Sequence, residues 1–495
     1  MAYEYPLEEF KKVWDESPII IFDTSSFCHL YKYTPETTTE FLEVLELVPR
    51  EQFWIPKQVI DEFNENHQEV INTAHSKYAA VTGTIEGLML STASKITRQF
   101  KKYNEFRYPS VKELEGKIQH AFKSINEEIA NYTENIKEEA EKNKEMLKED
   151  KVKAFVDGLI SSERIGEGFN YTQTLLIYSE GEMRYKYQIP PGYEDLEKDK
   201  RDATKRKKFG DLIVWKEILK KAEETKKPII FVTMDEKEDW WTLDKNNEPQ
   251  MPREELGKEF GDYSDATFVM MNLQNFYNNF STIVEKVRNI KSYLEINGES
   301  ICEELIDIQE WQTVLSSNGE FESYLVHSGQ IQDFFSDVVE NVEVNDYPEP
   351  EIWVNSVELV DDQVIIEADF TSRVGANVTR QIFREYTVTE DASLTVSGYI
   401  TFQFKVDLES QDDFVKTDNL NIKVGGFEIL DCESSGDDRC KDCGKRHASY
   451  LSADGGLLCD SCLSDYELCS ICGKGFEQGT LDGEFCDECK NSEGY

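Results

Sequence analysis

Short apolar runs that lead into an acidic residue restrict the fold of the first half of this chain. Residues 19–22 are followed directly by Asp23, and residues 229–233 lead to Asp235. Apolar runs of this length, bounded by polar residues, are typical of buried strands in a parallel sheet. The ligand crevice of an open α/β sheet lies outside the carboxyl ends of its strands. We therefore expect Asp23 and Asp235 to lie at one edge of such a sheet.

Two further acids stand where helices are expected to begin. Glu62 follows a second short strand at 53–56, and Asp211 comes before the apolar run 212–215. Single acids near helix starts are common as caps or dipole partners. Four of them in one pocket would repel each other unless a hard divalent cation neutralised them. The pattern favours metal-assisted hydrolysis of a phosphodiester.

The charge of the chain limits how it can meet nucleic acid. With 98 acidic and 54 basic residues, the formal net charge is −44. This argues against a broad phosphate-binding surface, because affinity for phosphate backbones comes largely from Lys and Arg. Basic residues nevertheless gather at 98–107 and 198–208. The second group lies just before Asp211, which favours substrate steering over the alternative of a solvated helix face.

Eight of the eleven cysteines form four Cys-x-x-Cys pairs near the end of the chain. In a cytosolic chain this spacing indicates zinc rather than disulfides. We expect two closed structural Zn²⁺ sites with sequential pairing, and a cross-braced arrangement, iron–sulfur ligation or a ligand role for His447 are the alternatives. Metal ligation would then supply most of the folding energy of so small a module. The expected ligands are Cys440, Cys443, Cys459, Cys462, Cys469, Cys472, Cys486 and Cys489.

At 495 residues the chain is expected to form two to four domains. The first, residues 1–289, is α/β with a helical insertion at about 68–155, because apolar residues recur at helical spacing from 111 to 136. Pairing of that helix with another chain is the competing interpretation. A helical connector at 290–345 is predicted to lead into an antiparallel β-sandwich at 346–430, then an acidic linker at 431–438 and the zinc module at 436–495. The expected strands lie at 352–360, 363–371, 383–389, 400–408 and 420–430.

No run of eighteen apolar residues occurs, so no membrane span is expected. The first residues lack the basic and apolar regions of a signal peptide, which makes the cytoplasm the expected location.

Six segments between about residues 15 and 285 resemble the PIN-like nuclease family, in its large bacterial branch with a helical insertion. They occur in the order of the family, and the resemblance covers somewhat over half of the chain. The segments are IFDTSS at 21–26, WIPKQVIDEF at 54–63, GEGF at 166–169, RYKYQIPPGYED at 184–195, FGDLIVW at 209–215 and FVTMDEKEDWW at 231–241.

The resemblance implies a Rossmann-like parallel sheet and a Mg²⁺- or Mn²⁺-dependent nuclease acting on RNA, or on single-stranded or structured DNA. It also implies that Asp23, Glu62, Asp211 and Asp235 are the catalytic and metal-binding acids. The family often has a second acid where this chain has Met234, a change that would affect metal affinity or metal choice.

Other residues are expected to support these acids. Thr24 and Thr233 would orient carboxylates through their hydroxyl groups, and Asp195 and Asp239 would support or replace a metal ligand. Arg184, Lys205, Arg206 and Lys208 would contact phosphate, with solvated surface as the alternative.

A role in antiphage defence or stress-induced RNA cleavage fits this branch of the family. The β and zinc modules would select the substrate, a trigger or a protein partner, and a homo-oligomer stays open. Two other functions compete with the nuclease: an inactive PIN-like scaffold, and a phosphatase or nucleotidase that uses the same metal chemistry.

Overall fold

The computed structural model divides the chain into two compact units, residues 1–288 and 289–495, which we describe separately. It describes residues 3–101, 109–146, 150–200, 202–244, 248–287, 289–316, 321–335, 338–383, 386–408, 415–434, 440–443, 450–454, 456–481, 483, 485–487 and 489–490.

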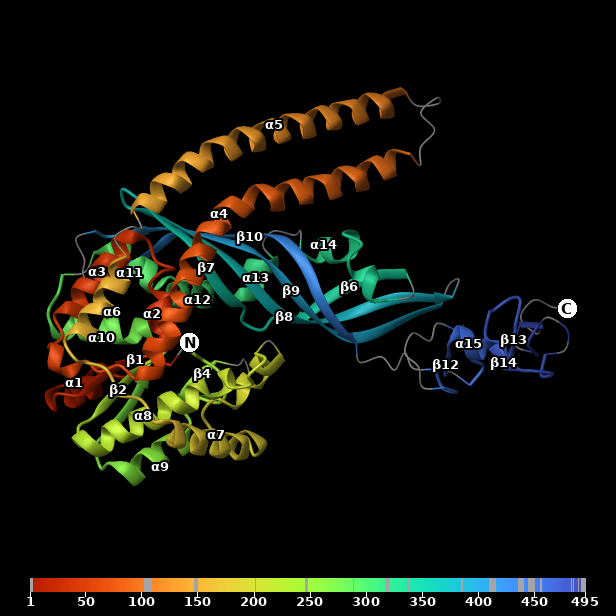
Figure 1. The fold of residues 1–495 in the computed structure, drawn as a ribbon. Coiled ribbons are helices and arrows are strands. Elements are labelled where there is room, and N and C mark those ends of the chain that lie inside the picture. The colour runs from red at the N-terminus through yellow and green to blue at the C-terminus, as the bar shows by residue number, and fades with distance from the viewer. Residues whose placement is uncertain are drawn as a thin grey trace. The chain divides into compact units, whose positions relative to one another are not determined.

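The first unit is built on a parallel sheet with strand order β1-β2-β5 (Figure 1). The strands are β1 (Ile19–Phe22), β2 (Ile229–Val232) and β5 (Phe268–Met271), and nearly every residue in them is buried. The segment 53–55 adds only isolated parallel bridges, from Phe53 to Ile20 and from Ile55 to Ile165. The predicted strand at 53–56 is therefore present as bridge pairs that extend the sheet beyond β1.

Helices cover this sheet, and two of them begin at functional residues. Asp23 is the N-cap residue of α2 (Thr24–His29), and Asp211 is the second residue of α8 (Gly210–Thr225). The predicted α/β class is confirmed. The remaining elements are α1 (Leu7–Asp15), α3 (Pro35–Glu46), η1 (Arg50–Gln52), α6 (Lys151–Ser161), α7 (Tyr171–Lys186), η2 (Tyr193–Lys200), η3 (Lys207–Phe209), β3 (Trp241–Leu243), β4 (Pro249–Pro252), α9 (Glu254–Tyr263) and α10 (Leu273–Ile283).

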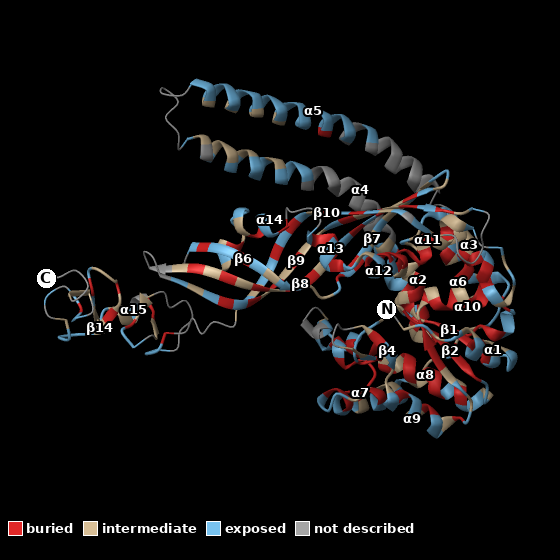
Figure 2. Ribbon diagram, turned by 180° about the vertical axis from the view of Figure 1, so that it is seen from behind, coloured by how far each residue is buried: buried red, intermediate tan, exposed pale blue. Residues whose placement is uncertain are grey.

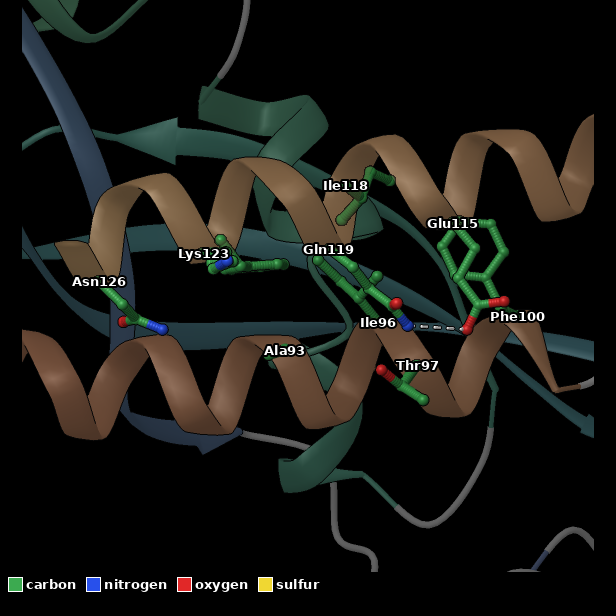
Figure 3. Close-up of a pocket in the computed structure, with 10 residues that line it drawn as sticks. Ala93, Ile96, Thr97, Phe100, Glu115, Ile118, Gln119, Lys123 and Asn126 are labelled. Atoms are coloured by element: carbon green, nitrogen blue, oxygen red, sulfur yellow. Dashed lines mark hydrogen bonds between the residues drawn. The ribbon is translucent and has the colours of Figure 1, made fainter.

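The predicted helical insertion is confirmed as a hairpin of two long helices, α4 (Lys57–Phe100) and α5 (Pro109–Met146). They lie side by side and antiparallel, and a cavity of about 230 Å³ between them is lined by residues such as Ile96, Phe100 and Ile118 (Figure 3). The predicted site residues take no part in that lining. Much of the described part of α5 is exposed (Figure 2). Several apolar side chains of the hairpin are exposed as well, among them Leu88 and Leu90.

The second unit contains a five-stranded antiparallel sheet with order β10-β9-β8-β6, in which β7 also pairs with β8. Two short strands share one edge of β8: β7 pairs with its residues 363–371 and β6 with 375–381. The strands are β6 (Val338–Asp346), β7 (Glu351–Val360), β8 (Gln363–Phe383), β9 (Tyr386–Val406) and β10 (Val415–Ser434). The helices are α11 (Ile290–Ile296), α12 (Gly298–Gln309), α13 (Trp311–Ser316), α14 (Phe321–His327) and η4 (Ile331–Phe334).

Alternation of apolar and polar residues builds the core of this second unit. Ile366 and Phe402 are opposite each other in β8 and β9 and are fully buried, as the predicted period of two requires. Helical residues such as Trp311 and Leu305 belong to the same core. The predicted antiparallel β domain is thus confirmed; its described strands join in one sheet, and the helical segment at 290–327 supplies the layer that covers it.

Several details of the predicted second unit were wrong. β6 begins at Val338, inside the segment 290–345 that was predicted to be a helical connector. β9 ends at Val406, so Leu408 lies beyond the strand and is exposed. The predicted linker begins too early, because β10 continues to Ser434 and pairs with β9 as far as Ala392. An edge strand tolerates charged residues since one side faces solvent, and Glu433 forms an ion pair with Arg373 there. Residues 435–438 lie outside the described part of the chain.

The described residues of the zinc module contain two short strand pairs. β11 (Tyr450–Leu451) pairs with β12 (Leu457–Leu458), and β13 (Tyr466–Leu468) pairs with β14 (Gly475–Glu477). The short helix α15 (Asp460–Leu463) follows β12. Across the described residues of the whole chain, none of the helices combines the length and the apolar character needed to cross a membrane.

Candidate active site

Parallel pairing of β1 and β2 brings two predicted acids to one edge of the sheet. Phe22 pairs with Val232 at the ends of these strands, and the Asp23 N–H donates a hydrogen bond of 2.9 Å to the Val232 carbonyl oxygen. Asp23 therefore begins where β1 ends, and Asp235 follows β2 three residues later. The sequence pattern of an apolar run leading into an acid has placed both at the carboxyl ends of adjacent strands.

Two hydroxyl groups connect these strand ends. Ser25 Oγ donates to Asp23 Oδ2 at 2.6 Å and accepts from the Met234 N–H at 3.0 Å. Thr233 Oγ1 donates to the same carboxylate oxygen at 3.2 Å and accepts from the Asp235 N–H at 3.0 Å. Thr233 thus has the orienting position that we expected. Ser25 was missed, although its place two residues after Asp23 is the usual spacing for a local side-chain hydrogen bond.

Glu62 lies in the second turn of α4, and its two carboxylate oxygens have different partners. Thr24 Oγ1 donates to Glu62 Oε2 at 3.1 Å, and Gln58 Nε2 donates to Oε1 at 2.7 Å. Thr24, which follows Asp23 in the chain, therefore links the end of β1 to the helix that carries Glu62. On the other side, Gly210 approaches so closely that a methyl group on it would lie 2.5 Å from Glu62 Oε1.

Asp211 lies beside the turn that precedes η2. The Trp240 indole N–H donates to Asp211 Oδ2 at 3.4 Å. Gly192, with a φ of +92°, comes so near that a methyl group there would lie 3.2 Å from the Asp211 Cβ and 2.6 Å from the Tyr185 hydroxyl oxygen. The backbone at 192 can approach Asp211 only because glycine tolerates this φ and has no Cβ.

The acids interact with one another through their charges. Burial raises the pKa of Asp211 well above its ordinary value, and the charges of Asp195, Asp235 and Asp23 raise it further. Burial also raises the pKa of Asp23 and of Glu62, and each has a neighbouring carboxylate that adds to the effect. Carboxylates held together with pKa values displaced upward form a site with excess negative charge, which a cation would stabilise.

Lysine side chains, which the sequence did not single out individually, contact this acidic site. Lys237 Nζ donates to Asp235 Oδ2 at 2.8 Å and to Asp195 Oδ1 at 3.0 Å. Lys198 Nζ forms an ion pair with the other oxygen of Asp195. The only sequence signals for them were a basic run around Lys198 and the position of Lys237 two residues after Asp235.

Asp239, which we expected to support the metal, has a different environment. It is fully buried, and its Oδ2 accepts from the Glu194 N–H at 3.0 Å. Its other oxygen has no hydrogen-bond partner among the described residues. Burial raises its pKa to about 6. This bond holds the start of η2, the element that carries Asp195 and Lys198.

Arg184, predicted to contact phosphate, points into the protein instead. Only 7% of it is exposed, and its guanidinium donates to Glu180 Oε1 and to the Pro190 carbonyl oxygen, each at 2.7 Å. It also forms an ion pair with Glu259. With these partners Arg184 fixes α7 and the turn at 190–192, and a phosphate would have to displace them.

The other three predicted phosphate contacts divide into one buried and two exposed residues. Lys208 is 5% exposed and forms an ion pair of 3.0 Å with Glu182, and its ammonium lies 4.9 Å from the centre of the Phe209 ring. Lys205 and Arg206 are exposed to solvent. Only these two of the four predicted cations present their side chains freely on the surface.

Glu217 was not predicted from the sequence, and it stabilises the helix that carries Glu62. It is 3% exposed, and its carboxylate accepts from the backbone N–H groups of Lys57 at 2.8 Å and Gln58 at 3.1 Å. These are the first N–H groups of α4, which lack partners inside the helix. Glu217 therefore fixes the helix that carries Glu62, and nothing in its sequence context indicated this role.

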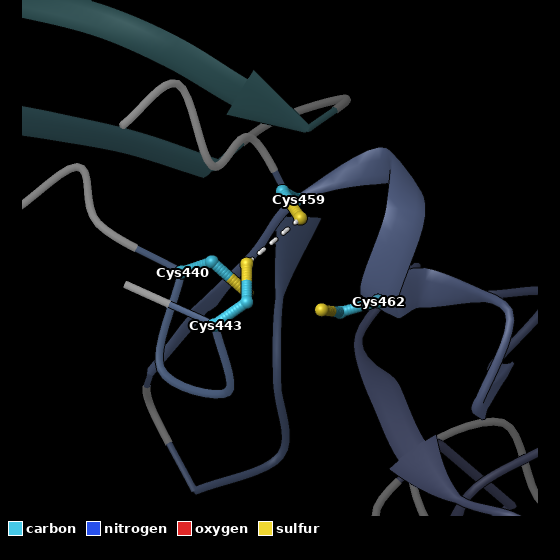
Figure 4. A group of neighbouring side chains, drawn as sticks. All are labelled: Cys440, Cys443, Cys459 and Cys462. Carbon is cyan, nitrogen blue, oxygen red and sulfur yellow. Dashed lines mark hydrogen bonds between the residues drawn. The ribbon is translucent and has the colours of Figure 1, made fainter. Parts of the chain in front are cut away.

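The structure brings the cysteines together in two quartets. Within the described part of the chain, these are the groups in which three or more possible ligand atoms of His, Cys, Asp or Glu lie within 4.8 Å of each other. The first quartet consists of Cys440, Cys443, Cys459 and Cys462 (Figure 4), and the second of Cys469, Cys472, Cys486 and Cys489. Pairing is thus sequential, as predicted, and consistent with tandem zinc modules. His447 lies outside the described residues.

Local hydrogen bonds favour the thiolate at Cys440 and at Cys469, one cysteine of each quartet, whereas the pKa values of Cys462 and Cys489 are raised by hydrogen bonds with neighbouring sulfurs. Burial raises the pKa of Cys440, but backbone N–H groups of Cys459, Cys443 and Asp442 outweigh it and lower the pKa to about 6. The pKa of Cys469 is lowered to about 6 in the same way. The thiolate is the form that binds metal, so both quartets fit a tetrahedral metal with four sulfur ligands.

A family model described as a PIN-like domain matches residues 19–256. Neither a search of curated proteins nor a search of solved structures found a match.

Proposed function

Residues 19–256 belong to the PIN-like domain family, and on this premise we propose that the protein is a divalent-metal-dependent endonuclease. It hydrolyses phosphodiester bonds of nucleic acid, with RNA as the substrate. The observation that carries the proposal is that four acids lie near the ends of β1 and β2, close enough for their charges to interact. They are Asp23, Glu62, Asp211 and Asp235. PIN-like domains are in general metal-dependent nucleases, and this acidic site is the part of the chain that fits such chemistry.

The donor atoms of the site fit Mg²⁺ or Mn²⁺. All four acids offer carboxylate oxygens, the ligands that hard divalent cations prefer. Burial, and then the neighbouring carboxylates, raise the pKa of Asp23 and Asp211, and a bound cation would counter both effects. Asp23, Glu62, Asp211 and Asp235 would hold the ion. A bound ion of this kind supplies a water of lowered pKa and stabilises charge on the phosphoryl group.

The residues around the acids keep them in place. Ser25 and Thr233 both donate to Asp23 Oδ2, which leaves its other oxygen free of side-chain donors among the described contacts. Thr24 and Gln58 fix Glu62. Such partners orient ligand carboxylates and are important for metal affinity.

Met234 does not disturb this arrangement. Its sulfur accepts from the Leu273 N–H at 3.5 Å, at the start of α10. Its N–H is bound to Ser25, so the backbone that places Asp235 is retained. We infer that the replacement of an acid by Met234 removes one negative charge and leaves the four acids in position.

Cleavage assays with Asp23→Asn test the proposal. We expect wild type to cut single-stranded RNA in Mn²⁺ and the variant to lose at least about 10³-fold in rate, because one metal ligand loses its charge. Asp15→Asn, at an exposed position at the end of α1, is the matched control and should cut normally. The proposal is wrong if purified wild type cuts neither RNA nor single-stranded DNA, or if Asp23→Asn cuts as well as wild type.

An inactive scaffold is the second candidate, and one observation favours it. The carboxylate oxygens of the four acids are not gathered within 4.8 Å of each other among the described residues. Calorimetric titration of Mn²⁺ separates the two: a nuclease should bind the ion at a site lost in Asp211→Asn, and a scaffold should not. Sequencing of RNA cut in cells expressing wild type or Asp23→Asn would then define the substrate. We propose that the cleavage occurs in the cytoplasm, in antiphage defence or in response to stress, and that the β and zinc modules bind a trigger protein. The identity of the cut RNA would test this role.

Gly210→Ala should reduce activity without reducing stability. Its backbone is helical, so alanine fits the conformation, and replacing glycine in a helix stabilises by roughly 0.5–1 kcal/mol. The new methyl group would lie 2.5 Å from Glu62 Oε1 and must displace this flexible carboxylate. We expect a rate loss of about 10²-fold and an unchanged or higher melting temperature. Gly261→Ala, where the methyl group meets no atom within 4 Å, is the control, and an active Gly210→Ala would show that Glu62 need not stay where it is.

A further inference from the structure

Two ammonium groups lie at the rim of the acidic site and share one carboxylate. Asp195 is 3% exposed, and its two oxygens bind Lys237 and Lys198 separately. Lys237 also donates a hydrogen bond to Asp235, and the charge of Asp211 acts on both lysines. Asp195 therefore acts as an anchor that holds two cations against the proposed metal ligands.

The anchor is fixed and the lysines are accessible. The Asp195 N–H donates to the Gly192 carbonyl oxygen at 3.2 Å, and Gly192 lies against Asp211. The side chains of Lys198 and Lys237 are 50% and 42% exposed. The carboxylate of Asp195 is thus buried, while the two lysine side chains reach solvent. Their positive charge is therefore accessible to a ligand from solution.

A phosphodiester is negatively charged and is therefore repelled by the four carboxylates of the site. A metal ion offsets part of this repulsion, but it also competes with Lys237 for Asp235. An ammonium group has three N–H donors, and the described hydrogen bonds of Lys237 use two of them, one on Asp235. If an ion took Asp235 as a ligand, Lys237 would keep its bond to Asp195 and would have N–H donors available for the phosphate.

We propose that Lys237 and Lys198 bind the non-bridging oxygens of the scissile phosphate and that Asp195 is the residue that positions them. This inference rests on the proposed nuclease function and identifies the cations of its substrate site. They differ from the cations expected from the sequence, since Arg184 and Lys208 are buried with acidic partners. The substrate site is then built on η2 and on the segment after β2.

RNA binding as a function of salt tests the lysines directly. Each phosphate contact to a single strand contributes a slope of about −0.7 to the plot of log affinity against log salt. In an Asp23→Asn background that does not cut, we expect Lys237→Met and Lys198→Met each to reduce this slope by about 0.7 for a fluorescent single-stranded RNA. Lys237→Arg should retain it. Lys220→Met, which removes a lysine of similar exposure paired with Glu224 on α8, should leave it unchanged.

Binding of Mn²⁺ alone separates substrate contact from metal contact. Lys237→Met should bind Mn²⁺ at least as tightly as wild type, because Asp235 loses a competing cation, and yet cut RNA about 10- to 100-fold more slowly. For Asp195→Asn, which keeps both ammonium groups, we expect the salt slope to stay and kcat to fall about 10-fold, with the melting temperature nearly unchanged.

The inference is overturned if the salt slopes of both methionine variants equal that of Lys220→Met, or if Lys237→Met loses Mn²⁺ affinity in proportion to its activity. It is also overturned if Asp195→Asn loses only stability. The nuclease proposal fails on a different result, namely a wild-type protein that does not cut in Mn²⁺.

Discussion

Asp211→Asn is expected to abolish cleavage and, in protein free of Mg²⁺ and Mn²⁺, to raise the melting temperature. The carboxylate is buried and repelled by Asp195, Asp235 and Asp23, so its pKa lies well above the ordinary value. Asparagine keeps the shape of the side chain and removes the repulsion. A gain of about 1 kcal/mol would raise the melting temperature of a domain of this size by about 2–4 °C. The loss of a metal-binding charge should lower the cleavage rate by about 10³-fold or more.

The pH dependence has a definite sign. Because the folded state has the higher pKa, it holds its proton over a range of pH in which the unfolded chain has already released it. Below the ordinary pKa of aspartate the two proteins should therefore be equally stable. As the pH rises from there to the raised pKa of Asp211, wild type loses stability relative to the variant, and above that pKa the difference is constant. Asp239, with a pKa of about 6, should lower the stability of both proteins between about pH 4 and pH 6, so it does not change the difference between them.

Melting curves between pH 4 and pH 8, in buffer freed of Mg²⁺ and Mn²⁺ but containing zinc, measure this difference. Addition of Mn²⁺ should make wild type melt at a higher temperature than Asp211→Asn. An ion that binds only the folded state stabilises wild type, whereas the variant lacks one of the ligands that would bind it. Asp15→Asn is again the control and should follow wild type throughout. A variant that melts below wild type without Mn²⁺, or that still gains stability from Mn²⁺ as wild type does, would contradict this account of the site.

The acids could be located from the sequence because their positions depend on local patterns. An apolar run followed by an acid defines a strand end, and parallel pairing then brings Asp23 and Asp235 together. The lysines could not be located in this way. Lys198 belongs to the 3₁₀ segment η2, which has no periodic pattern, and its position near Asp211 depends on how the turn at 190–192 packs against α8.

The same reasoning explains why Arg184 was assigned to the surface. One of its partners, Glu180, lies in the same helix, but the other, Glu259, comes from α9 and is distant in the sequence. Glu217 is the converse case, an acid on α8 whose partners are the first N–H groups of α4. Long-range ion pairs and caps of this kind depend on tertiary packing, whereas strand ends and cysteine spacing are visible along the chain.

Removal of zinc should unfold the cysteine-rich segment and leave the rest of the chain folded. Among the described residues around its first quartet, the buried core consists of Cys440, Leu458 and Cys459, and two of these are expected ligands. So small a core cannot offset the entropy of ordering the segment. Structural zinc contributes about 10–16 kcal/mol in comparable small modules. With a zinc chelator, residues 440–490 should therefore become sensitive to protease, while fragments that contain the PIN-like domain should resist.

Sequential pairing makes a sharper prediction for single substitutions. Each quartet uses two consecutive Cys-x-x-Cys pairs, so Cys459→Ser should reduce the zinc content from two ions per chain to one. In a cross-braced arrangement the two sites would share a folded unit, and the same substitution would release both ions. Cys432→Ser, which changes a cysteine of β10 outside the quartets, should retain two. Two ions bound to Cys459→Ser, measured by elemental analysis, would show that this thiolate is not a ligand.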